Sequence, residues 1–158
     1  ISNTVNAIIE PPFKNIIVNE QPIEYKDISF KDYDGNIINL RNQKGQIYFL
    51  NFWATWCLPC KEEMPYLDKL QNVNGIKIFP INIEKSNKFK TEIFFKSLEI
   101  KNLSIYFDIE TNLVNLFRLR GLPTTIILNK DKKEIARVIG AVDFLDQRFI
   151  DWINSMSN

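Results

Sequence analysis

A nearly continuous apolar segment, GQIYFLNFWA at residues 45–54, constrains the fold of this chain more than any other feature. Its β-branched and aromatic side chains favour a strand, and such an unbroken apolar run is typical of a strand that is covered on both faces. The longest apolar stretch, IYFLNFWATWCLP, is shorter than the roughly 18 residues that a membrane span needs. We therefore expect a buried central strand.

Other segments alternate in type along the chain. Apolar residues at helical spacing predict helices over residues 57–70, 87–100, 111–121 (capped by Thr111) and 142–153. Apolar runs predict strands at 75–84 and 103–108, and turn residues predict β-hairpins at 28–40 and 124–140. Strands that alternate with helices imply an α/β fold in which helices cover a central sheet.

The first 22 residues differ from the rest, because they carry three prolines and have no clean hydrophobic period. We expect residues 1–22 to form an extended leader, of the kind that links a domain to a membrane anchor. Residues 23–158 have the length and apolar content of a single domain.

Composition excludes several classes of function. The chain has no histidine, so Ser-His-Asp and Cys-His nucleophile pairs and His-ligated metals are impossible. A structural zinc site needs four N or S ligands, and the two cysteines supply only half of them, so we expect no metal site. The net charge of +1 comes from interleaved signs and gives no electrostatic footprint for nucleic acid.

Cys57 and Cys60 stand where the central strand is predicted to pass into a helix. The first turn of a helix has unpaired N–H groups and a partial positive charge, which favour a Cys57 thiolate over the thiol. Cys60 lies almost one turn further on and deeper, so it can attack a mixed disulfide formed at Cys57. Pro59 presets the helical backbone. The alternative is a pair of core thiols that happen to lie three residues apart.

Pro123, in RGLPTTIIL, directly precedes a predicted strand. The cis form of an X-Pro bond costs only about 0.5–1 kcal/mol, so a cis bond is accessible here. It would leave the backbone of Leu122 unpaired and facing the active site, where an extended client segment could add as a strand. The alternative is an ordinary proline at the start of a strand, but the CxxC motif upstream favours the first interpretation.

The segments FWATWCLPC, KEEMP and GLPTT resemble the thioredoxin-fold superfamily, and more narrowly its extracytoplasmic TlpA/ResA/CcmG-like branch of thiol-disulfide reductases. The resemblance extends from about Ile28 to Ile153, and GAVDF at 140–144 looks most like TlpA. It implies a thioredoxin fold, a central mixed β-sheet flanked by helices, with an N-terminal β-hairpin extension and an inserted central helix. The hairpin contains DGNIINL, and the inserted helix lies between INIE and LSIYF.

By position, the resemblance implies that Cys57 is the attacking thiol, Cys60 the resolving thiol and Pro123 the cis proline. The client-binding surface it implies consists of Trp56, Leu58, Pro59, Gly121, Leu122 and Pro123.

Asn51 stands where cytoplasmic thioredoxin has a buried Asp, and it cannot take a proton from Cys60. We expect Glu84, after the neighbouring strand, to do so; the alternative is a solvated carboxylate at a strand end. Glu62 and Glu63 lie in the early turns of the helix, where acidic residues suit the helix dipole, so we interpret them as helix stabilisers.

The resemblance also implies an activity. We expect a reductase that transfers electrons from a membrane thiol reductant to disulfides in copper-site assembly proteins of cytochrome oxidase or in apocytochrome c. Its redox-active disulfide is the only cofactor expected. We expect a monomer on the periplasmic side of a bacterial inner membrane, anchored by a segment upstream of this chain.

The residues between the cysteines, Leu58 and Pro59, give the thiolate little further stabilisation, which favours a reductase over an oxidase. The alternatives are a disulfide oxidase or isomerase, and a non-catalytic client-binding or metal-delivery chaperone.

Overall fold

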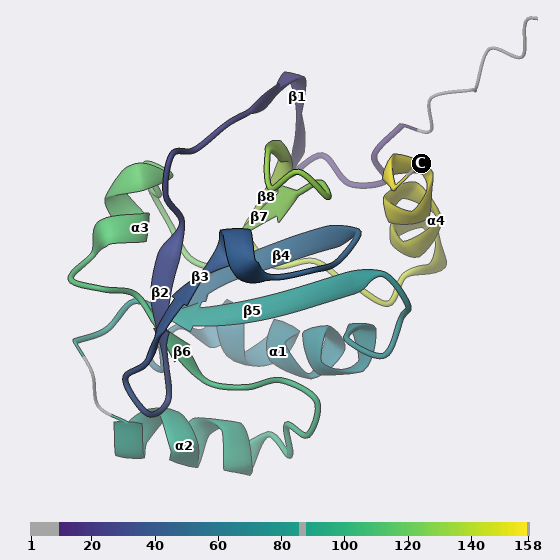
Figure 1. Cartoon of the computed structure of the whole chain (residues 1–158). Coiled ribbons are helices and arrows are strands. Elements are labelled where there is room, and N and C mark those ends of the chain that lie inside the picture. Colours follow the sequence, from purple (N-terminus) through teal and green to yellow (C-terminus); the bar gives the residue numbers. More distant parts are fainter. Residues whose placement is uncertain (1–9, 86–87, 158) are drawn as a thin grey trace, which may run out of the picture.

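The structure, a computed structural model, describes residues 10–85 and 88–157 (Figure 1). The strands are β1 (Ile16–Ile23), β2 (Ser29–Asp32), β3 (Ile37–Asn39), β4 (Ile47–Trp53), β5 (Ile76–Asn82), β6 (Tyr106–Phe107), β7 (Thr124–Leu128) and β8 (Glu134–Ile139). The helices are α1 (Leu58–Leu70), α2 (Lys88–Ser97), α3 (Asn112–Leu116) and α4 (Gln147–Met156), with a 3₁₀ turn at Leu40–Asn42. None of these helices is long and apolar enough to span a bilayer.

The strands form one mixed sheet in the order β1-β8-β7-β4-β5-β6-β2-β3. β4 runs parallel to β5 and antiparallel to β7, and β5 runs parallel to β6. The predicted α/β architecture is therefore confirmed. The predicted hairpins are also present, as β2–β3 and β7–β8, and α2 is the predicted inserted helix.

β4 is the centre of the molecule, because its seven residues are all buried. On one face of the sheet, Phe49 and Trp53 pack in a cluster with apolar residues of α1, α2 and α4. On the other face, Leu50 and Phe52 pack with α3 and the β2–β3 hairpin. A strand that is covered on both faces has to be apolar throughout, which explains the unbroken run in the sequence.

The leader expected over residues 1–22 joins the domain earlier than predicted. β1 pairs antiparallel with β8, with Ile16 opposite Val138, so residues 16–22 already belong to the sheet. Of the remaining residues of the expected leader, 10–15 precede β1 and 1–9 lie outside the described residues.

One local expectation, the cap of α3, differs from the structure. Thr111 makes no side-chain cap for α3. The Asp108 carboxylate accepts the N–H groups of Leu113 and Val114 instead, and its negative charge suits a helix start. On α2, Phe89 and Ile93 are exposed and Phe94 and Phe95 are buried, because only the latter pair reaches Trp53.

A buried ion pair fastens the first segment to the sheet. Arg137 donates to Glu134 at 2.6 Å, and its other terminal nitrogen donates to the Phe117 carbonyl. Tyr25 and Asn19 also donate to the Glu134 carboxylate. Burial acts to raise the pKa of Glu134, but these hydrogen bonds outweigh it and hold that pKa below its ordinary value.

Replacing Arg137 by Ala should lower the free energy of unfolding by about 2–3 kcal/mol, because it leaves the buried Glu134 carboxylate without its cation. The loss is at the low end for a buried pair because Tyr25 and Asn19 still donate. Urea denaturation at pH 7 measures it. The matched control is Arg148→Ala, which breaks an exposed pair with Asp146 and should leave stability nearly unchanged. Equal losses in the two variants would contradict this assignment.

Candidate active site at the start of α1

The two cysteines form a disulfide at the point where the chain leaves β4 and enters α1. Cys57 is the N-cap residue of α1, and its Sγ accepts a hydrogen bond from the Cys60 N–H at 3.3 Å. This N–H has no carbonyl partner within the helix, so it is free to bond the sulfur. After reduction, the same N–H and the helix dipole would stabilise a Cys57 thiolate.

Exposure around the disulfide differs from what the sequence predicted. Cys57 is 4% exposed and Cys60 is 1% exposed, so the expected contrast between them is small in the disulfide form. The neighbouring apolar side chains are exposed instead: Trp56 by 68% and Leu58 by 64%. We call these two exposed side chains the apolar rim, and exposed apolar side chains beside a disulfide are typical of a contact site.

The Leu122–Pro123 loop lies beside this rim, and its peptide bond is cis, as expected. Thr124, the next residue, pairs with Phe52 near the end of β4. The side chain of Leu122 packs against the apolar cluster that contains both cysteines. Within the described part of the chain, its backbone N–H and C=O have no hydrogen-bond partner, as predicted. Gly121 is exposed.

Behind the disulfide lies a buried carboxylic acid, Glu63, which is only 2% exposed. It is three residues after Cys60 in α1, a spacing that places the two side chains on one face of the helix. Its oxygens accept from the Asn51 side-chain amide at 2.9 Å and from the Val142 N–H at 3.1 Å. Burial raises the pKa of Glu63 to about 8, although both hydrogen bonds act to lower it.

Asn51 connects this acid to the sheet. Its amide nitrogen also donates to the Thr125 hydroxyl at 3.0 Å, whereas its carbonyl oxygen is buried without a partner in the described residues. A half-turn of the amide would direct that oxygen towards Glu63 and Thr125. Both could then donate to it, provided that Glu63 is protonated. The surroundings of Glu63 can therefore satisfy the neutral and the charged carboxyl group.

Glu84, which was predicted to exchange a proton with Cys60, is engaged with the turn that precedes Cys57. Its carboxylate accepts from the Thr55 N–H at 2.5 Å and from the Thr55 hydroxyl at 3.0 Å. Asn82 donates to it and Lys90 lies 3.7 Å away. Burial acts to raise the pKa of Glu84, but these partners outweigh it and lower the pKa, so Glu84 remains a carboxylate. It positions the turn before Cys57, and its proton exchange with Cys60 stays a prediction.

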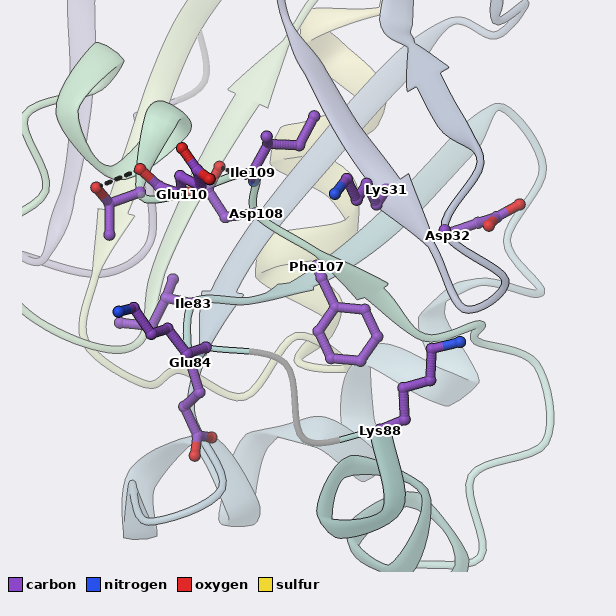
Figure 2. Close-up of a pocket in the computed structure, with 12 residues that line it drawn as sticks. Lys31, Asp32, Ile83, Glu84, Lys88, Phe107, Asp108, Ile109 and Glu110 are labelled. Atoms are coloured by element: carbon purple, nitrogen blue, oxygen red, sulfur yellow. Dashed lines mark hydrogen bonds between the residues drawn. The ribbon is translucent and has the colours of Figure 1, made fainter.

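Glu84 also borders a pocket of about 770 Å³ between the β2–β3 hairpin, β6 and the start of α2 (Figure 2). In the figure its carboxylate points away from Phe107 and Lys88. The pocket wall mixes cationic and acidic residues: Lys31, Lys85, Lys88, Asp32, Glu84, Asp108 and Glu110. With both charges present, it gives no preference for one kind of ligand.

Glu63 was interpreted as a helix stabiliser, yet the sequence contained a signal for its burial. Cys60, Met64, Leu67 and Leu70 form the buried stripe of α1, and Glu63 lies on the same stripe. Glu62, one residue earlier, is exposed. The helical period of α1 therefore places Glu63 on the buried face and Glu62 on the exposed face.

The described residues include no cluster of three or more Cys, Asp or Glu side chains that could hold a metal ion.

A CxxC disulfide at the start of a helix, with a cis-proline loop beside it, defines a thioredoxin-like thiol-disulfide protein. The chain belongs to the AhpC/TSA family, which its residues 23–137 match.

Thiol-disulfide oxidoreductases named ResA are among its relatives. A ResA of Bacillus cereus is 32% identical over 112 residues, which cover 69% of this chain and 64% of the relative. The ResA of Bacillus subtilis (strain 168) is 34% identical over 115 residues, which cover 71% and 63%. The chain therefore spans less than two thirds of the length of these relatives. They fit the predicted TlpA/ResA/CcmG-like branch, whereas the finer likeness to TlpA stays a prediction.

Solved structures support the fold. StoA from Bacillus subtilis superposes with a TM-score of 0.65 at 25% identity, covering 84% of this chain and 99% of that one. A thiol:disulfide interchange protein of the thioredoxin family from Chlorobium tepidum TLS gives a TM-score of 0.68 at 21% identity, covering 85% and 99%. The predicted thioredoxin fold is confirmed.

The raised pKa of Glu63 makes stability depend on pH. The folded disulfide form holds the Glu63 proton up to a pKa of about 8, whereas the unfolded chain loses it near 4.5. The contribution of Glu63 to the free energy of unfolding is therefore fully present below pH 4.5, and it is lost as the pH rises towards 8. Relative to Glu63→Gln, which stays neutral, the free energy of unfolding should fall by up to about 1.4 kcal/mol per pH unit.

Urea denaturation of the disulfide form at several pH values measures this slope. Glu62→Gln is the matched control, because it removes an exposed carboxylate one residue away and should follow the unmodified protein. If the unmodified protein and Glu63→Gln showed the same pH dependence, Glu63 would not be a neutral acid near pH 7.

Proposed function

We propose that this protein is a thiol-disulfide oxidoreductase that reduces disulfides in extracytoplasmic client proteins through Cys57 and Cys60. The observation that carries the proposal is the buried acid, Glu63, on the same helix face as Cys60. A disulfide with a purely structural role needs no proton-exchanging group beside it. Dithiol exchange does need one, because the resolving thiol loses its proton when it attacks.

In the proposed reaction, the Cys57 thiolate attacks one sulfur of a client disulfide. The client S–S bond breaks, its other sulfur leaves as a thiolate, and a mixed disulfide joins Cys57 to the client. Cys60 then attacks the Cys57 sulfur, which forms the Cys57–Cys60 disulfide and releases the second client thiolate. Two electrons have passed to the client, and the protein has been oxidised.

Glu63 takes the proton from Cys60 in the second step. With a pKa of about 8, it is a carboxylate in about one tenth of the molecules at pH 7 and exchanges protons readily near neutrality. The Val142 N–H and the Asn51 amide hold the carboxyl group in place. Glu84 contributes by fixing Thr55, two residues before Cys57.

Clients would dock on the exposed apolar rim and on the free backbone of Leu122, which can pair with an extended segment. The surface that they would meet consists of Trp56, Leu58, Pro59, Gly121, Leu122 and Pro123. Leu58 and Pro59 offer the Cys57 thiolate no further charge, so its stabilisation comes from the helix start. This favours reduction over oxidation or isomerisation of client disulfides.

The resemblance to the TlpA/ResA/CcmG-like branch supports a more specific role. The clients would be copper-site assembly proteins of cytochrome oxidase or apocytochrome c, and a membrane thiol reductant would return electrons to the disulfide. The protein would act as a monomer on the periplasmic side of a bacterial inner membrane, with its redox-active disulfide as its only cofactor.

Separate cysteine variants test the assigned roles. Cys60→Ser should accumulate a mixed disulfide with a disulfide-bonded peptide, because the resolving attack is gone. Cys57→Ser should form none and should be inert in reduction. Mass spectrometry of the trapped adduct and the rate of peptide reduction measure both. Reduction by Cys57→Ser at the unmodified rate would overturn the proposal.

The two glutamates should differ in their effect on the resolving step. Glu63→Gln should slow release of the client about 10- to 100-fold at pH 7, with the deficit shrinking at higher pH as Cys60 ionises by itself. Glu84→Gln should leave the shape of the pH profile unchanged, because Glu84 only positions the turn. Stopped-flow kinetics of mixed-disulfide decay between pH 6 and 9 separate them. If Glu84→Gln changed the shape of the pH profile and Glu63→Gln did not, Glu84 would be the acid–base residue.

A further inference from the structure

A second pocket, of about 380 Å³, begins where the Leu122–Pro123 loop ends. It is lined by Arg118, Leu119, Arg120, Gly121, Thr124, Arg137 and Ile139. Gly121 and Thr124 flank the loop on its two sides, and the Thr124 hydroxyl donates to the Gly121 carbonyl at 2.7 Å. A chain that paired with Leu122 would therefore pass the mouth of this pocket.

The charge of this pocket has one sign. Three arginines line it, and its lining, all of it within the described residues, includes no carboxylate. Arg137 is already engaged with Glu134 and the Phe117 carbonyl. Arg118 and Arg120 are exposed, and neither side chain has a hydrogen-bond or ion-pair partner in the part of the chain that the structure describes. Two guanidinium groups thus remain available to a ligand.

Backbone hydrogen bonds hold the first part of the segment that carries these arginines. Arg118 adopts a left-handed conformation with φ of 52°, and its N–H donates to the Asn115 carbonyl at 3.2 Å. The Leu119 N–H donates to the Val114 carbonyl at 3.0 Å. Both bonds tie the segment to α3. Ile139, 46% exposed, adds an apolar wall to the same pocket.

We propose that this pocket binds the carboxylate of an Asp or Glu side chain of the client, within about four residues of the client cysteine. The proposal rests on the proposed function, because it requires the client to pair with Leu122. Planar guanidinium groups match the two oxygens of a carboxylate, and an apolar wall suits the methylene groups that carry it. The pocket in Figure 2 offers no such preference, because acidic residues share its wall.

The distance limit follows from strand geometry. An extended chain advances about 3.3 Å per residue, and its side chains alternate between two faces. Gly121 and Thr124 both lie within two residues of Leu122, so a client side chain that enters the pocket belongs to the stretch next to the cysteine. Alternation further predicts that acidic residues are favoured at every second position of that stretch and not at its neighbours.

The test uses extended neutral peptides with one cysteine activated as a 2-thiopyridyl disulfide. Reduced Cys57 attacks the peptide sulfur, and the released thiopyridone is followed by absorbance. Peptides with Asp are compared with their Asn counterparts at each of four positions on both sides of the cysteine, at 150 mM salt. At the favoured positions, Asp should react about three- to ten-fold faster than Asn.

The ratio of the Asp rate to the Asn rate is the readout, so any general change in reactivity cancels. In Arg118→Gln/Arg120→Gln this ratio should fall to about one. The matched control is Lys31→Gln/Lys85→Gln, which removes two exposed cations from the other pocket and should keep the ratio.

Three results would overturn the inference: no position that prefers Asp, a preference that survives loss of both arginines, or an equal loss in the lysine variant. If the proposed function were wrong, the same experiment would give a different result. In that case Cys57 would react with every peptide, Asp or Asn, no faster than a small-molecule thiol does.

Discussion

All seven residues of β4 are buried, because α1, α2 and α4 cover one face of this strand and α3 covers the other. This burial determines the order of the strands in the sheet. It also determines where α1 begins and where the disulfide lies. β4 ends at Trp53, and a short turn leads from there into α1, which begins at Leu58. Cys57 therefore becomes the N-cap of a helix, where a thiolate is stabilised.

Asn51, the polar residue of that buried strand, has to find its partners inside the protein. It finds them in Thr125 and in Glu63. The second contact holds a carboxyl group in the core, and among the described residues no cation forms an ion pair with it. Burial without a cation raises the pKa of Glu63. An acid with a pKa near neutrality then lies on the same helix face as Cys60.

The apolar run of β4, the CxxC motif and the Asp34-Gly35 turn were sufficient to predict the sheet, the helix start and the hairpin, because each depends on local chemistry. The burial of Glu63 was not predicted. Glu84 was chosen from its place after a strand, but Thr55 and Asn82 engage it. The partners of Glu63 lie 12 and 79 residues away, at Asn51 and Val142. Only the fold reveals such contacts. Arg118 and Arg120 likewise line a pocket beside the Leu122–Pro123 loop, because the chain turns after α3 at a left-handed Arg118. The spacing of residues in the sequence does not predict this turn.

With a pKa of about 8, Glu63 is a neutral acid at pH 7 when the disulfide is formed. Titration of the Glu63 side-chain carboxyl carbon by ¹³C NMR, in protein labelled at glutamate and assigned with Glu63→Gln, measures this directly. The structure predicts a midpoint of about 8 in the disulfide form. A midpoint near the ordinary value of 4.5 would contradict the account, because Glu63 would then be a carboxylate throughout the working range.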